Sequence, residues 1–90
     1  MNNTYLGSTY RFYVGWYRYS GGDSKPWVAA AIDIDKSDNF PEKFDDLDAG
    51  DTDAILALDY IEENADFYAR GETPAIAMQA VEAMVTEKLN

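Results

Sequence analysis

The chain has 90 residues, contains neither histidine nor cysteine, and carries a formal net charge of −10 from 17 acidic and 7 basic side chains. This length suits one small domain, so we expect residues 1–90 to fold as a single unit. Without cysteine there can be no disulfide and no thiolate metal site, and without histidine the commonest general base is missing. These exclusions predict a protein that is not an enzyme and needs no cofactor.

Hydrophobic residues make up 47% of the chain, which is enough for a core and argues against a disordered acidic tail. The first residues show no basic segment followed by an apolar stretch, as an export signal would. No run approaches the roughly 18 apolar residues that a membrane span requires. We therefore expect a cytoplasmic protein without membrane association.

Residues 9–35 alternate between two faces and predict an antiparallel β-hairpin, with the turn in the sequence GGDSKP. The pattern favours a core face made of even-numbered positions. A two-stranded hairpin is marginal alone, so we expect either the NTYLG segment or a second copy of the protein to complete the sheet. The even-numbered positions are Tyr10, Phe12, Val14, Trp16, Val28, Ala30, Ile32 and Ile34.

Residues 36–50 read as an acidic loop, in which a short helical turn can start at Pro41. Residues 51–70 predict a helix capped by Asp51 or Thr52 and ended by Gly71. Residues 74–89 predict a second helix, because Thr73 can cap it and Pro74 suits its first position. The predicted class is α+β: an antiparallel β-hairpin or small sheet with two C-terminal helices packed on one face. The apolar stripe of the first helix is Ala54, Leu58, Ile61, Ala65 and Tyr68.

A calcium loop is suggested by oxygen-bearing residues at alternate positions, Asp33, Asp35 and Ser37. Such a loop needs glycine at its sixth position and a bidentate glutamate at its twelfth. Asp38 and Phe44 stand there instead. A dedicated metal site is therefore not expected, and a weak calcium-binding domain is the third choice of function.

The predicted first helix carries four carboxylates spaced i, i+3, i+4 and i+7, which places them on one stripe. A band of carboxylates resembles the phosphates of nucleic acid electrostatically, so it would repel nucleic acid and attract a basic nucleic-acid-binding protein. The alternative is a solvated face that only confers solubility. The stripe is Asp59, Glu62, Glu63 and Asp66, and the acids that lead into it are Asp45, Asp46, Asp48, Asp51 and Asp53.

Four aromatic residues occupy the odd-numbered face of the hairpin: Tyr13, Tyr17, Tyr19 and Trp27. Exposed tyrosine and tryptophan usually mark an interface. Burial of these residues by a loop, the N-terminus or a helix is the alternative. If they are exposed, the protein is a protein–protein interaction or homodimerisation module, which is the second choice of function.

The DDLDAGDTD run and the carboxylates of the stripe resemble, in composition, the small acidic anti-defence inhibitors of phages and plasmids, such as DNA-mimicking antirestriction proteins and anti-CRISPR proteins. The resemblance covers the second half of the chain, where residues 32–90 hold sixteen acidic and four basic residues, a net charge of −12. It implies a stoichiometric inhibitor that occupies the positively charged groove of a nuclease or a CRISPR complex. The basic, aromatic first 31 residues fit no such template.

Overall fold

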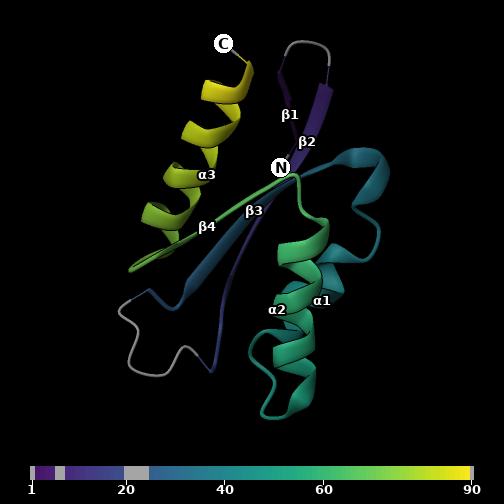
Figure 1. The fold of residues 1–90 in the computed structure, drawn as a ribbon, viewed down its shortest axis with the longest axis vertical. Coiled ribbons are helices and arrows are strands. Elements are labelled where there is room, and N and C mark those ends of the chain that lie inside the picture. Colours follow the sequence, from purple (N-terminus) through teal and green to yellow (C-terminus); the bar gives the residue numbers. More distant parts are fainter. Residues whose placement is uncertain (1, 6–7, 20–24, 90) are drawn as a thin grey trace.

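The computed structural model describes residues 2–5, 8–19 and 25–89. Its centre is a four-stranded antiparallel sheet in the order β1-β2-β3-β4, shown in Figure 1. The α+β class and the antiparallel sheet are therefore confirmed. The strands are β1 (Asn2–Tyr5), β2 (Ser8–Trp16), β3 (Trp27–Asp33) and β4 (Phe67–Gly71).

The two longest helices begin where their capping residues predict. The carboxylate of Asp51 accepts a hydrogen bond from the backbone N–H of Asp53, and the hydroxyl of Thr73 accepts one from Ile76. Among the described residues, no helix is both long enough and apolar enough to cross a membrane. The segments are the 3-10 helix η1 (Ile34–Lys36) and the α-helices α1 (Phe40–Asp46), α2 (Thr52–Asn64) and α3 (Pro74–Leu89).

The expected hairpin forms between β2 and β3. Its register, however, does not put the even-numbered residues of both strands on the same face. Tyr10 pairs with Asp33 and Trp16 with Trp27, so paired residue numbers always sum to an odd value. Directly opposed residues in an antiparallel pair point to the same face. Even-numbered side chains of β2 therefore share a face with odd-numbered side chains of β3.

Two cores result, one on each face of the sheet. On one face Phe12, Ala29 and Ala31 pack against Val81 and Val85 of α3. The opposite face packs against α1 and α2, and its largest fully buried residues are Val28, Ile32, Phe40, Leu47 and Ile61. Residues Val28 to Ile32 of β3 are accordingly 0% exposed.

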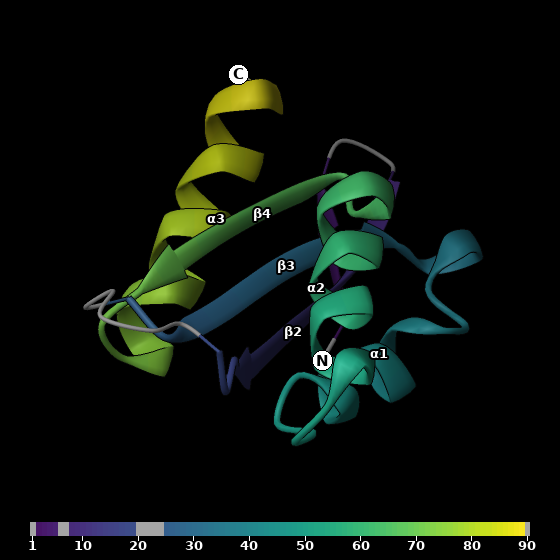
Figure 2. The same cartoon turned by 60° about the horizontal axis from the view of Figure 1, so that its bottom comes forward.

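The helices therefore lie on opposite faces, unlike the expected arrangement with both on one face. Figure 2 shows α3 on one side of β3 and β4, and α1 and α2 on the other. The physical reason is β4, an edge strand that lies between α2 and α3 in the chain. The chain leaves one face of the sheet after α2, forms this edge strand, and continues on the other face as α3. Since β3 is apolar on both faces, each helical layer finds its own buried surface there.

The predicted helix 51–70 is too long, since α2 ends at Asn64 and Ala65 already has an extended backbone. The next residues form β4, which pairs with β3 from Ala31↔Phe67 to Trp27↔Gly71. Gly71 does not end a helix. A Cβ atom there would lie 2.6 Å from the backbone nitrogen of Ala77, so glycine lets α3 approach β4 closely.

The predicted acidic loop 36–50 is partly ordered as η1 and α1. Phe40, Phe44 and Leu47 of this segment point into the core. The expected third strand from NTYLG is confirmed as β1, which pairs with residues 8–11 of β2. Residues 6–7 and 20–24, including most of the predicted GGDSKP turn, lie outside the described residues.

Candidate functional site

The outward side of α2 combines acidic and large apolar residues. The helix turns Ala54, Ala57, Leu58 and Ile61 into the core, which leaves the opposite side facing solvent. On that side two aliphatic side chains are strongly exposed, Ile55 at 47% and Leu56 at 57%. We call this surface the α2 outer face and define it by Ile55, Leu56, Asp59, Glu62 and Glu63.

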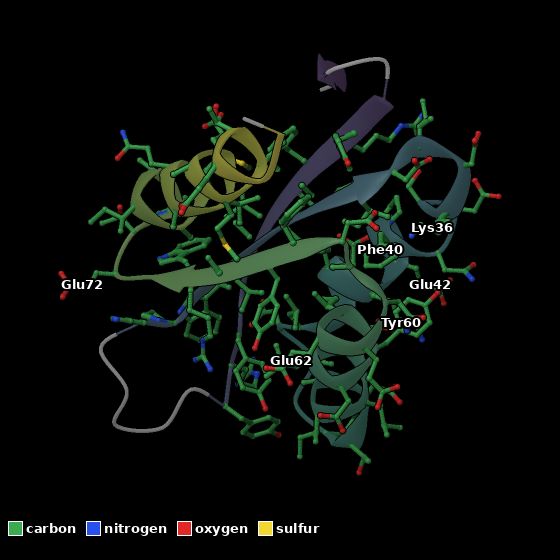
Figure 3. The ribbon with its side chains drawn as sticks, turned by 45° about the horizontal axis from the view of Figure 1, so that its top comes forward. Lys36, Phe40, Glu42, Tyr60, Glu62 and Glu72 are labelled. Carbon is green, nitrogen blue, oxygen red and sulfur yellow. The ribbon has the colours of Figure 1, made fainter. Side chains whose placement is uncertain are left out.

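Among the residues that the structure describes, no ion pair involves a carboxylate of the α2 outer face. Arg18 pairs with Asp48 and Lys36 pairs with Asp66, and neither pair involves this face. Glu62 accepts a hydrogen bond of 3.1 Å from the hydroxyl of Tyr68 on β4. Figure 3 shows Glu62 and Tyr60 on opposite sides of α2. The hydrogen bond to Glu62, followed by burial, raises the pKa of Tyr68.

Asp66 does not belong to the predicted stripe. It follows the end of α2, and its carboxylate accepts hydrogen bonds from the backbone N–H of Asp33 at 2.7 Å and from Lys36 Nζ at 2.8 Å. The hydrogen bond to Asp66 raises the pKa of Lys36. Asp66, directly before β4, therefore bonds to the end of β3 and to η1, which is a structural role.

The other acidic residues of the predicted surface have unequal roles. Asp51 caps α2, and Asp48 pairs at 3.8 Å with Arg18. Asp46 is half-buried, whereas Asp45 and Asp53 are exposed. These residues lie in α1, between α1 and α2, or in the first turn of α2, before the α2 outer face in the chain. The structure thus places Asp59, Glu62 and Glu63 on α2 and separates Asp66 from them.

The four predicted aromatic residues do not form one exposed face. Tyr17 is only 8% exposed, and Tyr13 stacks on Phe44 with ring centres 5.5 Å apart. Trp27 packs on the opposite face with the α3 core, while Tyr19 remains 43% exposed. Because Trp27 pairs with Trp16, it lies on the opposite face of the sheet from Tyr13 and Tyr17.

Sequence reasoning missed the exposed apolar residues Val14, Trp16, Ile55 and Leu56. Ile55 and Leu56 lie off the 54–58–61 stripe at helical spacing, which is a signal that could have identified them. For Val14 and Trp16 there was no such signal, because their exposure depends on where α3 crosses the sheet.

The oxygen-bearing residues of the suspected calcium loop stabilise η1 instead. The Asp33 carboxylate accepts from the N–H of Asp35, and the fully buried Ser37 donates its hydroxyl to the carbonyl of Ile34. Within residues 2–5, 8–19 and 25–89, no group of three or more histidine, cysteine, aspartate or glutamate residues is placed to hold a metal ion.

No protein-family model, curated protein or solved structure matches the chain.

Proposed function

We propose that the protein is a non-enzymatic inhibitor whose acidic surface imitates the phosphates of nucleic acid and blocks a basic nucleic-acid-binding protein. A nuclease or a CRISPR complex is the type of target that the resemblance to anti-defence inhibitors implies. The partner is then a protein and not nucleic acid itself, since the excess of carboxylates repels phosphates. We place this activity in the cytoplasm, where such targets act.

The observation that carries the proposal is the group of carboxylates on the α2 outer face, which form no ion pair within the described part of the chain. Asp59 and Glu63 are exposed and lie about 6 Å apart along the helix at ~1.5 Å per residue, with neither in an ion pair among the described residues. Like charges at i, i+3 and i, i+4 cost a helix a few tenths of a kcal/mol per pair. A helix that keeps Asp59, Glu62 and Glu63 together gives up stability that a mixed-charge face would retain.

Ile55 and Leu56 add a feature that phosphates lack. They lie one turn before Asp59 on the same side of α2, so a partner that contacts the carboxylates also covers exposed apolar surface. In such an interface charge mainly accelerates and orients association, whereas buried apolar contacts slow dissociation. We infer that the partner presents a basic groove with an apolar patch beside it.

The test is capture of partners from bacterial lysate by the tagged protein at low and at high salt, with identification by mass spectrometry. We expect nucleic-acid-binding proteins to be retained at low salt, displaced by duplex DNA and released at high salt. The variant Asp59→Asn/Glu62→Gln/Glu63→Gln should lose most of this capture. Asp66 stays unchanged in this variant because its carboxylate holds Asp33 and Lys36.

The matched control is Glu72→Gln/Glu82→Gln/Glu87→Gln. These three glutamates are also exposed, and they lie in or just before α3, so both variants have the same net charge. Equal loss in both variants would show that only total charge matters and would reject a specific α2 surface. Undiminished capture by the first variant would reject the proposal altogether.

We do not extend the proposal to dimerisation through Tyr13, Tyr17, Tyr19 and Trp27. Tyr17 lies in the core, where the guanidinium of Arg70 sits 5.6 Å from the centre of its ring. Substituting such a residue would disturb the fold before it reported on an interface.

A further inference from the structure

The second half of β2 forms an outer edge of the sheet. β1 pairs with β2 only at residues 8–11, whereas β2 continues to Trp16. Figure 1 shows β1 beside the upper part of β2 alone. Among the described strands, none pairs with Val14, Gly15 or Trp16 on that side. We call these three residues the β2 edge.

The backbone of the β2 edge has hydrogen-bonding groups directed away from the sheet. The N–H of Tyr17 donates to the carbonyl of Pro26 at 2.9 Å, which continues the ladder one step beyond Trp16↔Trp27. Hydrogen-bonded and non-hydrogen-bonded pairs alternate in an antiparallel ladder. Gly15 therefore bonds to β3, and the N–H and C=O groups of Val14 and Trp16 point outward.

The side chains at this edge are apolar and exposed on one face. Val14 is 37% exposed and Trp16 is 40% exposed, on the face of the sheet that α3 covers farther along at Phe12. An unpaired strand edge flanked by exposed apolar side chains is a template for a further strand. Native edges are usually protected from this by charged side chains, which the β2 edge lacks.

The other face of the same edge is covered by α1 and Leu47. α1 packs over β2 there, and a Cβ atom on Gly15 would lie 3.3 Å from the carbonyl oxygen of Phe44. The exposed Asp45 follows Phe44 in α1, whereas Asp48 pairs with Arg18. The backbone N–H of Arg18 donates to the carbonyl of Leu47 at 3.0 Å, so the open part of the edge ends after Trp16. A strand added to the β2 edge would therefore have Val14 and Trp16 on one face and α1, with the exposed Asp45, on the other.

We propose that the β2 edge is a docking site for an extended, basic segment of a partner protein, which joins the sheet as an additional strand. Its alternate side chains would be apolar toward Val14 and Trp16 and basic toward Asp45. A second copy of this chain fits poorly, because two molecules of charge −10 would bring their α1 carboxylates together. This docking proposal rests on the proposed function in one respect only, namely that the partner is positively charged.

The first test uses NMR hydrogen exchange with the peptide acetyl-Lys-Val-Lys-Val-Lys-Val-Lys-amide as the probe. In the free protein, the amides of Val14 and Trp16 should exchange faster than those of Tyr13 and Gly15. At saturating peptide, exchange at Val14 and Trp16 should slow about tenfold or more, with little change at Tyr13 and Gly15. A peptide of the same charge, N-methylated on alternate residues, should not produce this protection, since it cannot complete the hydrogen bonds.

The second test compares two double variants of equal charge. Val14→Lys/Trp16→Lys places cations on the β2 edge, whereas Ile76→Lys/Met84→Lys places them at similarly exposed positions on α3. Peptide affinity should fall about tenfold or more only in the first variant, a loss of about 1.4 kcal/mol or more. Equal affinity in both variants, or peptide-induced changes at Asp59 and Glu63 instead of the edge, would overturn the proposal.

Protection of Val14 and Trp16 that rises with protein concentration, without peptide, would also overturn it, because a second copy would then occupy the edge. These outcomes are separable from failure of the proposed function. The Asp59→Asn/Glu62→Gln/Glu63→Gln variant tests the α2 outer face and leaves the β2 edge unchanged.

Discussion

Tyr68 links two elements through a single hydroxyl. It lies on β4 and donates to the carboxylate of Glu62 on α2, and this hydrogen bond favours the neutral phenol. Lys36 responds similarly to Asp66, which favours its charged form. Both pKa values are raised above their ordinary values of 10.0 and 10.5, so the folded state binds these two protons more tightly than the unfolded state does.

A raised pKa stabilises the fold below the unfolded value and ceases to do so as the pH passes the folded value. We therefore expect the free energy of unfolding to fall as the pH rises above about 10, measured by urea titration from about pH 8 to about pH 11. Tyr68→Phe should cost about 0.5 kcal/mol near neutral pH and make the alkaline decline shallower. Tyr19→Phe, at an exposed position, is the control, and identical alkaline slopes for Tyr68→Phe and the parent would refute this role.

Single residues were predictable where the physics is local. Thr73 was predicted as a cap, and Asp51 was one of two candidates with Thr52, because a capping side chain needs only its own helix terminus. Asp66 was misplaced because its partners, Asp33 and Lys36, lie about thirty residues away in sequence. Helical spacing placed it with Asp59 and Glu63, but the fold determines its role.

At the scale of elements, β4 is the clearest failure of local reasoning. Ala65 and Tyr68 continue the apolar spacing of α2, so the helical pattern extends past the true end of the helix at Asn64. Pairing with the remaining edge of β3 stabilises an extended conformation instead. Helix propensity is a weak preference that such tertiary pairing overrides. The hairpin and the helix 74–89 were predictable because pattern, turn and caps agree there.

The contact between β4 and α3 gives a prediction about Gly71. Gly71→Ala places a methyl group 2.6 Å from the backbone of Ala77, which must shift, and we expect a loss of about 1–3 kcal/mol. Gly50→Ala is the matched control, because no atom lies within 4 Å of its Cβ position and its backbone is not left-handed. That variant should gain about 0.4–1 kcal/mol by restricting the unfolded chain. Urea unfolding measures the stability of both variants. Equal changes in the free energy of unfolding would contradict the close approach of α3 to β4 at Gly71.

At the scale of the whole molecule, the net charge of −10 opposes compactness. Salt screens this repulsion, and it also weakens the two exposed ion pairs, Arg18 with Asp48 and Lys36 with Asp66. Exposed ion pairs contribute little, so repulsion should dominate. The α+β class and the antiparallel sheet could be predicted from the sequence, whereas the placement of the helices on opposite faces depends on β4, which the helical pattern of residues 51–70 conceals.

We expect urea unfolding to show a stability gain of about 0.5–1 kcal/mol between about 20 and about 300 mM sodium chloride. The Asp59→Asn/Glu62→Gln/Glu63→Gln variant should start more stable and gain less, because it carries three fewer repelling charges. If salt instead lowered the stability of both proteins, the ion pairs would outweigh the repulsion.

β3 contributes side chains to both cores, one on each of its faces. Ala29 and Ala31 belong to the α3 side, and Ala30 belongs to the side of α1 and α2. Neither helical layer can detach without exposing one face of the same strand, and that strand holds β2 and β4 in place. The protein has two hydrophobic interiors but a single cooperative unit, in which loss of either interior removes the support of the other.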